Sequence, residues 1–369
     1  MLSLMILLIV FFLIAVRQIG NLKLQIWQIM LFGALASIIT GEISIISAFQ
    51  AIKFDVLFFL FGMFVIGQAL EDSGYLSHLA YKLFKKARNM DELILLILFG
   101  AGISSAILMN DTLAIIGTPV VLLLAKNHKI NAKVLLLALC FSVTIGSDMS
   151  PIGNPQNLLI AMHLKEPFFT FLKYLFIPSI INLFVTFFIL KIFFKEKFNT
   201  NILKHSEEPI KDKTLKKLSK LSLILVVFLI ILKIIFVYLN INFDFKLTYI
   251  ALISSLPIII YRLYCLITGK KFHILTKIDW HTLIFFTSMF ILMQSVWDDG
   301  FFQELIKKTN IDLGSIEIIY LISVFLSQFI SNVPLVALYL PLILNPNIKQ
   351  MIALASGSTI AGNLLILGA

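Results

Sequence analysis

Long apolar runs, separated by short charged or Gly/Pro-containing segments, follow one another along the whole chain. The runs are too long and too continuous for half-exposed strands, and their lengths suit helices that enter lipid. They lie at residues 2–16, 24–40, 54–70, 93–125, 133–162, 171–194, 220–239, 247–264, 281–297, 315–344 and 350–369. This pattern predicts an all-α polytopic membrane protein.

Basic residues at the ends of the runs set the expected topology, because cytoplasmic loops are enriched in Lys and Arg. The run 93–125 is flanked by Lys82, Lys85, Lys86 and Arg88 on one side and by Lys126, His128, Lys129 and Lys133 on the other. Both of its ends should therefore be cytoplasmic. Two legs of about 16 residues reach roughly 24 Å each, less than a hydrocarbon core of about 30 Å. We expect a re-entrant hairpin at 93–125 with its tip at Asn110-Asp111-Thr112.

The remaining loops extend this topology to the rest of the chain. The lysine-rich stretch that includes 195–219 should be cytoplasmic, with the N-terminus outside, and 201–219 should link a first half, 1–200, to a second half, 220–369. The stretch 298–317 has a net acidic balance, as expected of an external loop. A second hairpin at 315–344, with its tip at Ser331-Asn332, would then enter from outside.

The two predicted hairpins share a sequence pattern. SAILMNDTLAIIGTP at Ser105 to Pro119 aligns without a gap with SQFISNVPLVALYLP at Ser327 to Pro341. Four identical pairs are each 222 positions apart: Ser105/Ser327, Asn110/Asn332, Leu113/Leu335 and Pro119/Pro341. Inverted-topology repeats with interrupted helices are typical of secondary transporters. We therefore expect two inverted repeats, each with a re-entrant hairpin and a broken transmembrane helix.

The first broken helix is predicted at 133–162. Its centre, VTIGSDMSPIGNPQNLLIA, holds two prolines and two glycines within ten residues, which a regular helix does not accommodate. Helices are expected at 134–145 and from Asn157, with carbonyls between them for a cation and a positive helix end for an anion. The alternative is an external loop between two short helices, which the lack of Lys and Arg between Lys133 and Lys165 disfavours.

The second broken helix, 350–369, ends soon after Asn363. We therefore expect the second repeat to be incomplete at its C-terminus, without the far half of this helix or a final span.

Asp111 and Asp148 are the only carboxylates expected at mid-membrane. An ionised Asp there costs roughly 2.5–3.5 kcal/mol, which by default indicates function. We expect a sodium or proton site at these two acids, although Asp111 could instead cap the second hairpin leg with help from Thr112. The second half supplies only neutral groups, and these are Ser331, Asn332, Ser358, Thr359 and Asn363.

Composition restricts the function further. Hydrophobic residues make up 59% of the 369 residues, and the net charge is +10. The basic residues are scattered over short loops without an aromatic platform, so positive-inside topology explains them and nucleic acid is not an expected partner. No paired-His metal motif, phosphate loop or nucleophile elbow is present, and neither an enzyme activity nor a cofactor is expected apart from a coupling ion.

Four motifs, MNDTLAIIGTPVVL, SPIGNPQNLLIA, SNVPLVALYLP and GSTIAGNLLILGA, resemble those of the ion transporter superfamily. The nearest branch contains the arsenite efflux-pump membrane subunits and citrate transporters. The resemblance implies an elevator-type motion, commonly in homodimers, and leaves open a cytoplasmic ATPase subunit. It also implies a set of residues around ions and substrate, and these are Asn110, Asp111, Thr112, Ser147, Asp148, Asn154, Ser331, Asn332, Ser358, Thr359 and Asn363, beside Asn157 from the helix break.

These observations predict an ion-coupled secondary transporter of a small anion or oxyanion in the cell membrane. Arsenite- or antimonite-type efflux is the first expectation, and carboxylate transport is the second. A sodium/proton antiporter, a non-transporting truncated remnant and an intramembrane enzyme are the alternatives.

Overall fold

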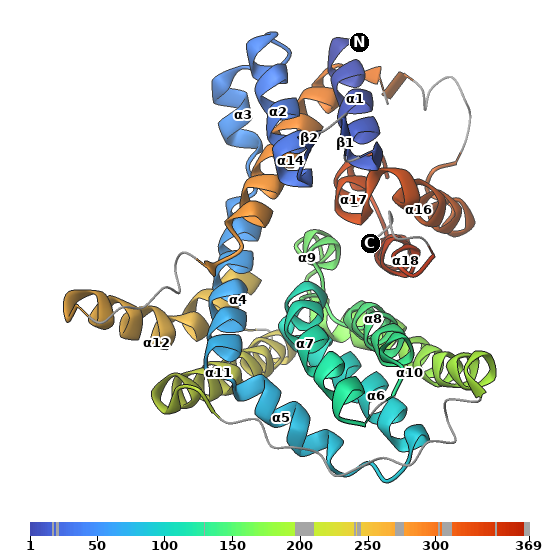
Figure 1. Cartoon of the computed structure of the whole chain (residues 1–369). Coiled ribbons are helices and arrows are strands. Elements are labelled where there is room, and N and C mark those ends of the chain that lie inside the picture. Colours follow the sequence, from blue (N-terminus) through green and yellow to red (C-terminus); the bar gives the residue numbers. More distant parts are fainter. Residues whose placement is uncertain are drawn as a thin grey trace. The chain divides into compact units, whose positions relative to one another are not determined.

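The computed structural model describes residues 1–16, 18–19, 22–128, 130–195, 210–239, 241, 245–269, 277–301, 303–304, 312–343 and 345–364. These residues are helical throughout except for turns and one small antiparallel pair, β1 (Gln18–Ile19) with β2 (Leu22–Lys23) (Figure 1). The all-α class expected from the apolar runs is therefore confirmed. The chain forms two compact units, one from Met1–Leu57 and Asp279–Ala369 and the other from Phe58–Ile278.

The first unit combines the start and the end of the chain. Its helices are α1 (Leu2–Val16), α2 (Ile26–Ile39), α3 (Ile45–Ala51), α14 (Trp280–Asp298), α16 (Ile316–Ile330), α17 (Asn332–Tyr339), the 3-10 turn η2 (Leu340–Leu342) and α18 (Ile348–Ala361). Helix α14 packs along α2, and α16 packs along α18. Gly33 allows α1 and α2 to approach closely, because a Cβ there would lie 2.5 Å from Val10 Cγ2.

The second unit holds the first hairpin and the first helix break. Its helices are α4 (Phe54–Asp72), which begins in the first unit, α5 (Tyr75–Phe84), α6 (Met90–Leu108), α7 (Asn110–His128), α8 (Ala132–Asp148), α9 (Pro155–Ala161), α10 (Pro167–Phe193), α11 (Lys213–Tyr238) and α12 (Leu247–Ile267). Helices α6 and α8 share the most extensive contact. They cross where Gly102 meets Gly146, since a Cβ on Gly146 would lie 2.1 Å from the Gly102 carbonyl oxygen.

Five of the described helices, α4, α6, α10, α11 and α12, are long and apolar enough to cross a membrane. Shorter apolar helices occur at Leu2–Val16, Ile26–Ile39, Ile316–Gln328 and Asn332–Leu342. Helices α10 and α11 are the least enclosed of the five, with most of their apolar side chains on the surface. The chain is therefore a multi-pass membrane protein; the cell membrane as its location and the orientation of its termini stay predictions.

Several helices extend beyond the apolar runs that predicted them, into charged residues at their ends. Helix α6 begins at Met90 and α7 ends at His128, so each leg has a charged turn beyond the apolar part counted from the sequence. Helix α11 begins at Lys213, inside the predicted linker 201–219. The Asp212 carboxylate caps it by accepting from the N–H groups of Thr214 and Leu215, at 2.8 and 2.9 Å. Residues 201–209 of that linker lie outside the described residues.

Candidate functional site

The first hairpin turns at a single residue. Helix α6 ends at Leu108, Met109 adopts φ 71° and ψ 143°, and α7 begins at Asn110. This backbone region is favourable only for glycine, so Met109 holds local strain, and its side chain is fully buried. The N–H of Asn110 donates to the Gly153 carbonyl oxygen at 2.8 Å. The hairpin tip is thereby attached to the loop that interrupts the next helix.

That interruption is shorter than the sequence predicts. Helix α8 continues to Asp148, and α9 starts at Pro155, so only Met149–Asn154 are non-helical. Gly146 stays helical because the absence of a side chain lets α8 contact Gly102 of α6. Proline is favoured at the first helical position, where its missing N–H would have no helical partner. Helix α9 therefore begins at Pro155, two residues before the predicted Asn157.

Three buried side chains hold the break together. The Asn154 side chain accepts from the Asn157 N–H at 2.8 Å and donates to Ser147 Oγ at 3.2 Å. The Asn157 side-chain amide donates to the carbonyl oxygens of Ser147, Asp148 and Ser150, at 3.3, 3.3 and 3.1 Å. The carbonyls at the end of α8, expected to face a cation, therefore already share an amide donor from α9. The structure brings Ser147, Asn154 and Asn157 together, as the grouping in the sequence suggested.

The two acids of the first half lie in different surroundings. Asp148 is 5% exposed, and its Oδ1 is buried without a hydrogen-bond partner among the described residues. Asp111, in the first turn of α7, is exposed. Thr112 beside it is buried and packs on α4, where a Cβ on Gly67 would lie 2.5 Å from Thr112 Cγ2. Of the two candidates, Asp148 has the environment that calls for a cation or a proton.

The second hairpin repeats the backbone of the first. Helix α16 ends at Ile330, Ser331 adopts φ 66° and ψ 158°, and α17 begins at Asn332. Ser331 stands 222 positions after Met109, the offset found in the sequence repeat. The side-chain Oδ1 of Asn332 is buried without a partner in the part of the chain that the structure describes. The two tips thus share their place in the sequence repeat and their backbone conformation, although their residues differ.

A buried polar seam runs between α16 and α18. Gln328 on α16 donates to the carbonyl oxygens of Val324 and Ala361, each at 2.9 Å, so its Oε1 is fixed as an acceptor and has no partner among the described residues. Asn363 Oδ1 is likewise buried and unpartnered there. Ser358 is fully buried but donates within its own helix, to Leu354 at 2.7 Å.

Sequence reasoning missed Gln328. Its counterpart 222 positions earlier is Ala106, so the repeat gave no signal for it. The one sequence signal for Gln328 was a polar side chain within an otherwise apolar helix. Among the described residues, no group of three or more His, Cys, Asp or Glu side chains could hold a metal ion.

Comparison with known proteins agrees with this architecture. The silicon efflux transporter LSI3 of Oryza sativa subsp. japonica is 37% identical over 142 residues, covering 38% of this chain and 29% of LSI3. The arsB protein of Dictyostelium discoideum is 28% identical over 147 residues, covering 40% of this chain and 26% of arsB. The matches thus span less than a third of the length of these two relatives.

Among solved structures, the YdaH transporter of Alcanivorax borkumensis superposes with a TM-score of 0.54 and covers 97% of this chain and 86% of that one. At 14% identity, this likeness shows the fold alone. The family described as citrate transporter matches residues 6–361, nearly the whole chain. The chain therefore belongs to the citrate transporter family.

Proposed function

We propose that this protein is an ion-coupled secondary transporter that exports a small hydroxylated oxyacid, with arsenite or antimonite first and a carboxylate next. The observation that carries the proposal is the buried Asp148 Oδ1, which has no hydrogen-bond partner among the residues that the structure describes, at a helix break that is bonded to a hairpin tip. Hairpins and broken helices at membrane depth build the sites of secondary transporters.

Asp148 is the proposed site of the coupling cation or proton. A buried carboxylate oxygen without a donor is unfavourable, and a bound cation or a proton removes that penalty. No Lys or Arg lies between Lys133 and Lys165, so the neighbouring sequence supplies no competing positive charge. Asn154 and Asn157 hold the end of α8 in place and thereby position the carboxylate.

The polar groups of the second hairpin favour an oxyacid over a fully ionised carboxylate. Gln328 Oε1 and Asn332 Oδ1 are acceptors that have no partner within the described part of the chain, and no Lys or Arg lies within 315–344. Acceptors of this kind suit a solute that donates O–H groups. Arsenous and silicic acids keep their protons near neutral pH and present such donors, and the relative LSI3 is a silicon efflux transporter.

The test is flux into proteoliposomes that contain purified protein. Arsenite, silicic acid, citrate and sodium are compared under imposed sodium and pH gradients. Asp148→Asn should lower gradient-driven oxyacid transport at least tenfold, because the amide cannot hold a cation by charge. The matched control is Asp91→Asn, which removes a half-buried carboxylate whose Oδ2 is paired with Lys191 at 2.6 Å, and this variant should transport normally. Full coupling in folded Asp148→Asn would contradict the assignment.

Sodium/proton antiport is the second candidate, favoured by two acids in the first half and none at the second hairpin tip. Sodium-driven proton movement without any oxyacid would support it. A homodimer and a cytoplasmic ATPase subunit remain proposals from the resemblance, testable by mass measurement of the purified protein and by co-purification.

A further inference from the structure

Helix α11 has one buried face and one exposed face along its whole length. The buried face consists of Leu215, Ser219, Ser222, Val226 and Leu229. The opposite face, which runs from Lys213 to Tyr238 at spacings of three or four residues, is exposed at every position. Because α11 is long and apolar enough to span a membrane and little of it is enclosed by the protein, this exposed face meets lipid.

The exposed face changes from basic to apolar along the helix. Its first three members are Lys213, Lys217 and Lys220. Apolar side chains follow at the same spacing, and of these Ile224 is 54% exposed and Phe228 is 56% exposed. Among the described residues, no hydrogen bond or ion pair engages the ammonium group of any of the three lysines. Helix α11 contains no acidic residue, so their positive charge is not offset within the helix.

The length of the apolar part places the lysines at the boundary of the membrane. Lys220 and Tyr238 are 18 positions apart, which at 1.5 Å per residue is about 27 Å, close to a hydrocarbon core of about 30 Å. Lys217 lies about 4.5 Å beyond Lys220, within a headgroup layer that is roughly 5–7 Å thick on each side. Side chains on a helix lean toward its N-terminus, so these lysines extend away from the hydrocarbon. Their ammonium groups therefore lie at the level of lipid phosphates.

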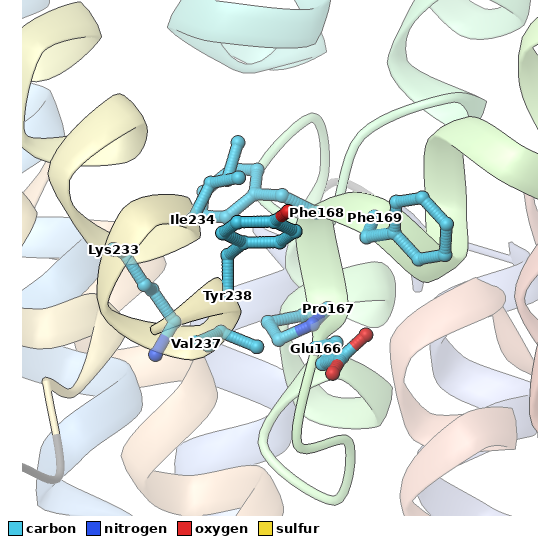
Figure 2. A pocket seen from close by; sticks show the side chains of 8 residues that line it. All are labelled: Glu166, Pro167, Phe168, Phe169, Lys233, Ile234, Val237 and Tyr238. Carbon is cyan, nitrogen blue, oxygen red and sulfur yellow. The ribbon is translucent and has the colours of Figure 1, made fainter. Parts of the chain in front are cut away.

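The other end of α11 has a different chemistry. Val237 and Tyr238 line a mostly apolar pocket together with Phe168 and other residues at the start of α10 (Figure 2). The one lysine in this lining, Lys233, donates to the Phe245 carbonyl oxygen, so its ammonium already has an acceptor. Attraction for an anion is therefore expected at the Lys213 end of the helix and not at the Tyr238 end.

An anionic phospholipid matches both parts of the exposed face. Its phosphate can accept from Lys217 and Lys220, while an acyl chain lies along Ile224 and Phe228. Lys213, one turn farther out, adds to the attraction because it lies within a Debye length of about 8–10 Å. A zwitterionic lipid is attracted less, since its own positive group offsets the phosphate. We propose that the basic end of α11 binds an anionic glycerophospholipid through these three lysines.

Lipid retention by purified, delipidated protein tests the proposal. Native mass spectrometry compares the retained phosphatidylglycerol and phosphatidylethanolamine at equal concentrations. Wild-type protein should favour phosphatidylglycerol at least fivefold, the factor expected from about one lysine close to an anionic lipid. The triple variant Lys213→Gln, Lys217→Gln, Lys220→Gln should lose this preference. The matched control Lys82→Gln, Lys85→Gln, Lys86→Gln removes three exposed lysines at α5, and thus the same charge, and should keep it.

A photo-crosslinking residue gives a second measurement that leaves all three lysines intact. At Leu221 it should label phosphatidylglycerol over phosphatidylethanolamine, whereas at Ile235, equally 43% exposed near the other end of α11, it should label both alike. Inorganic phosphate and glycerol phosphate at millimolar concentration should not displace the lipid, because neither contacts the apolar part of the face. Displacement by inorganic phosphate, a wild-type protein without the preference, or equal loss of the preference in both triple variants would overturn the proposal.

Discussion

The bond between the first hairpin tip and the helix break can be tested by adding one carbon atom. In Gly153→Ala, the new Cβ would lie 2.2 Å from the Ser147 carbonyl oxygen and 2.7 Å from Ser147 Cα. Real Cβ atoms essentially never approach a heavy atom within 3.0 Å, so Gly153 must move by about 0.8 Å. Both neighbours are backbone atoms, and no side chain can rotate to make room.

The same residue accepts the 2.8 Å hydrogen bond from the Asn110 N–H. A shift of about 0.8 Å along that bond would lengthen it to about 3.6 Å, where it no longer counts as a hydrogen bond. The net free energy lost is about 0.5–1.5 kcal/mol. This loss corresponds to an increase of roughly two- to thirteenfold in the population of the open tip.

Hydrogen exchange measured by mass spectrometry reports this population without any need to know the substrate. The peptide spanning residues 109–113 should exchange roughly two- to thirteenfold faster in Gly153→Ala. The matched control is Gly117→Ala, whose Cβ would have side-chain carbons of Leu139 as its nearest neighbours, at 3.0, 3.2 and 3.7 Å, and a side chain can move aside. Unchanged exchange at the tip of a folded Gly153→Ala protein would refute the reasoning.

Three further predictions concern stability, each measured by thermal unfolding in detergent. Gly146→Ala should destabilise the protein by at least about 1–3 kcal/mol, because its Cβ would lie 2.1 Å from the Gly102 carbonyl oxygen; wild-type stability would contradict the close crossing. Ser331→Gly should stabilise the protein, because relief of a φ of 66° is worth about 1–3 kcal/mol and exceeds the roughly 0.4–1 kcal/mol lost through the greater unfolded-state entropy of glycine, whereas Ser331→Ala should not. Equal effects would exclude backbone strain as the cause. Arg262→Met should stabilise the protein by about 1 kcal/mol or more, since Arg262 is 3% exposed and its three guanidinium nitrogens have no hydrogen-bond partner among the described residues. A lower unfolding temperature would show that the charge is paired.

Much of the path of the chain could be predicted from local sequence. The repeat placed the two tips at Asn110 and Asn332, and the structure starts a helix at each of them. Prolines and glycines identified the break after Asp148 because their effect on a helix depends on the backbone alone. The inverted orientation of the halves rests on loop charge and stays a prediction.

The details of the site depend on packing that sequence patterns do not reveal. In a membrane, lipid-facing and buried positions are both apolar, so periodicity does not show which side of a helix meets another helix. The bonds from Gln328 to Ala361 and from Asn157 to the end of α8 join separate helices, and they exist only once those helices have packed. For the same reason, the burial of Asp148 and the exposure of Asp111 could not be distinguished in advance.

The shared geometry at Met109 and Ser331 has a consequence for recognising distant relatives. A buried thioether and a small hydroxyl occupy equivalent apices, so no residue type identifies this turn. Both tips share an asparagine at the next position, Asn110 and Asn332. In an alignment of distant relatives, the residue whose torsion angles define the turn should therefore vary in type. Comparison of backbone conformations would then find such turns where sequence comparison does not.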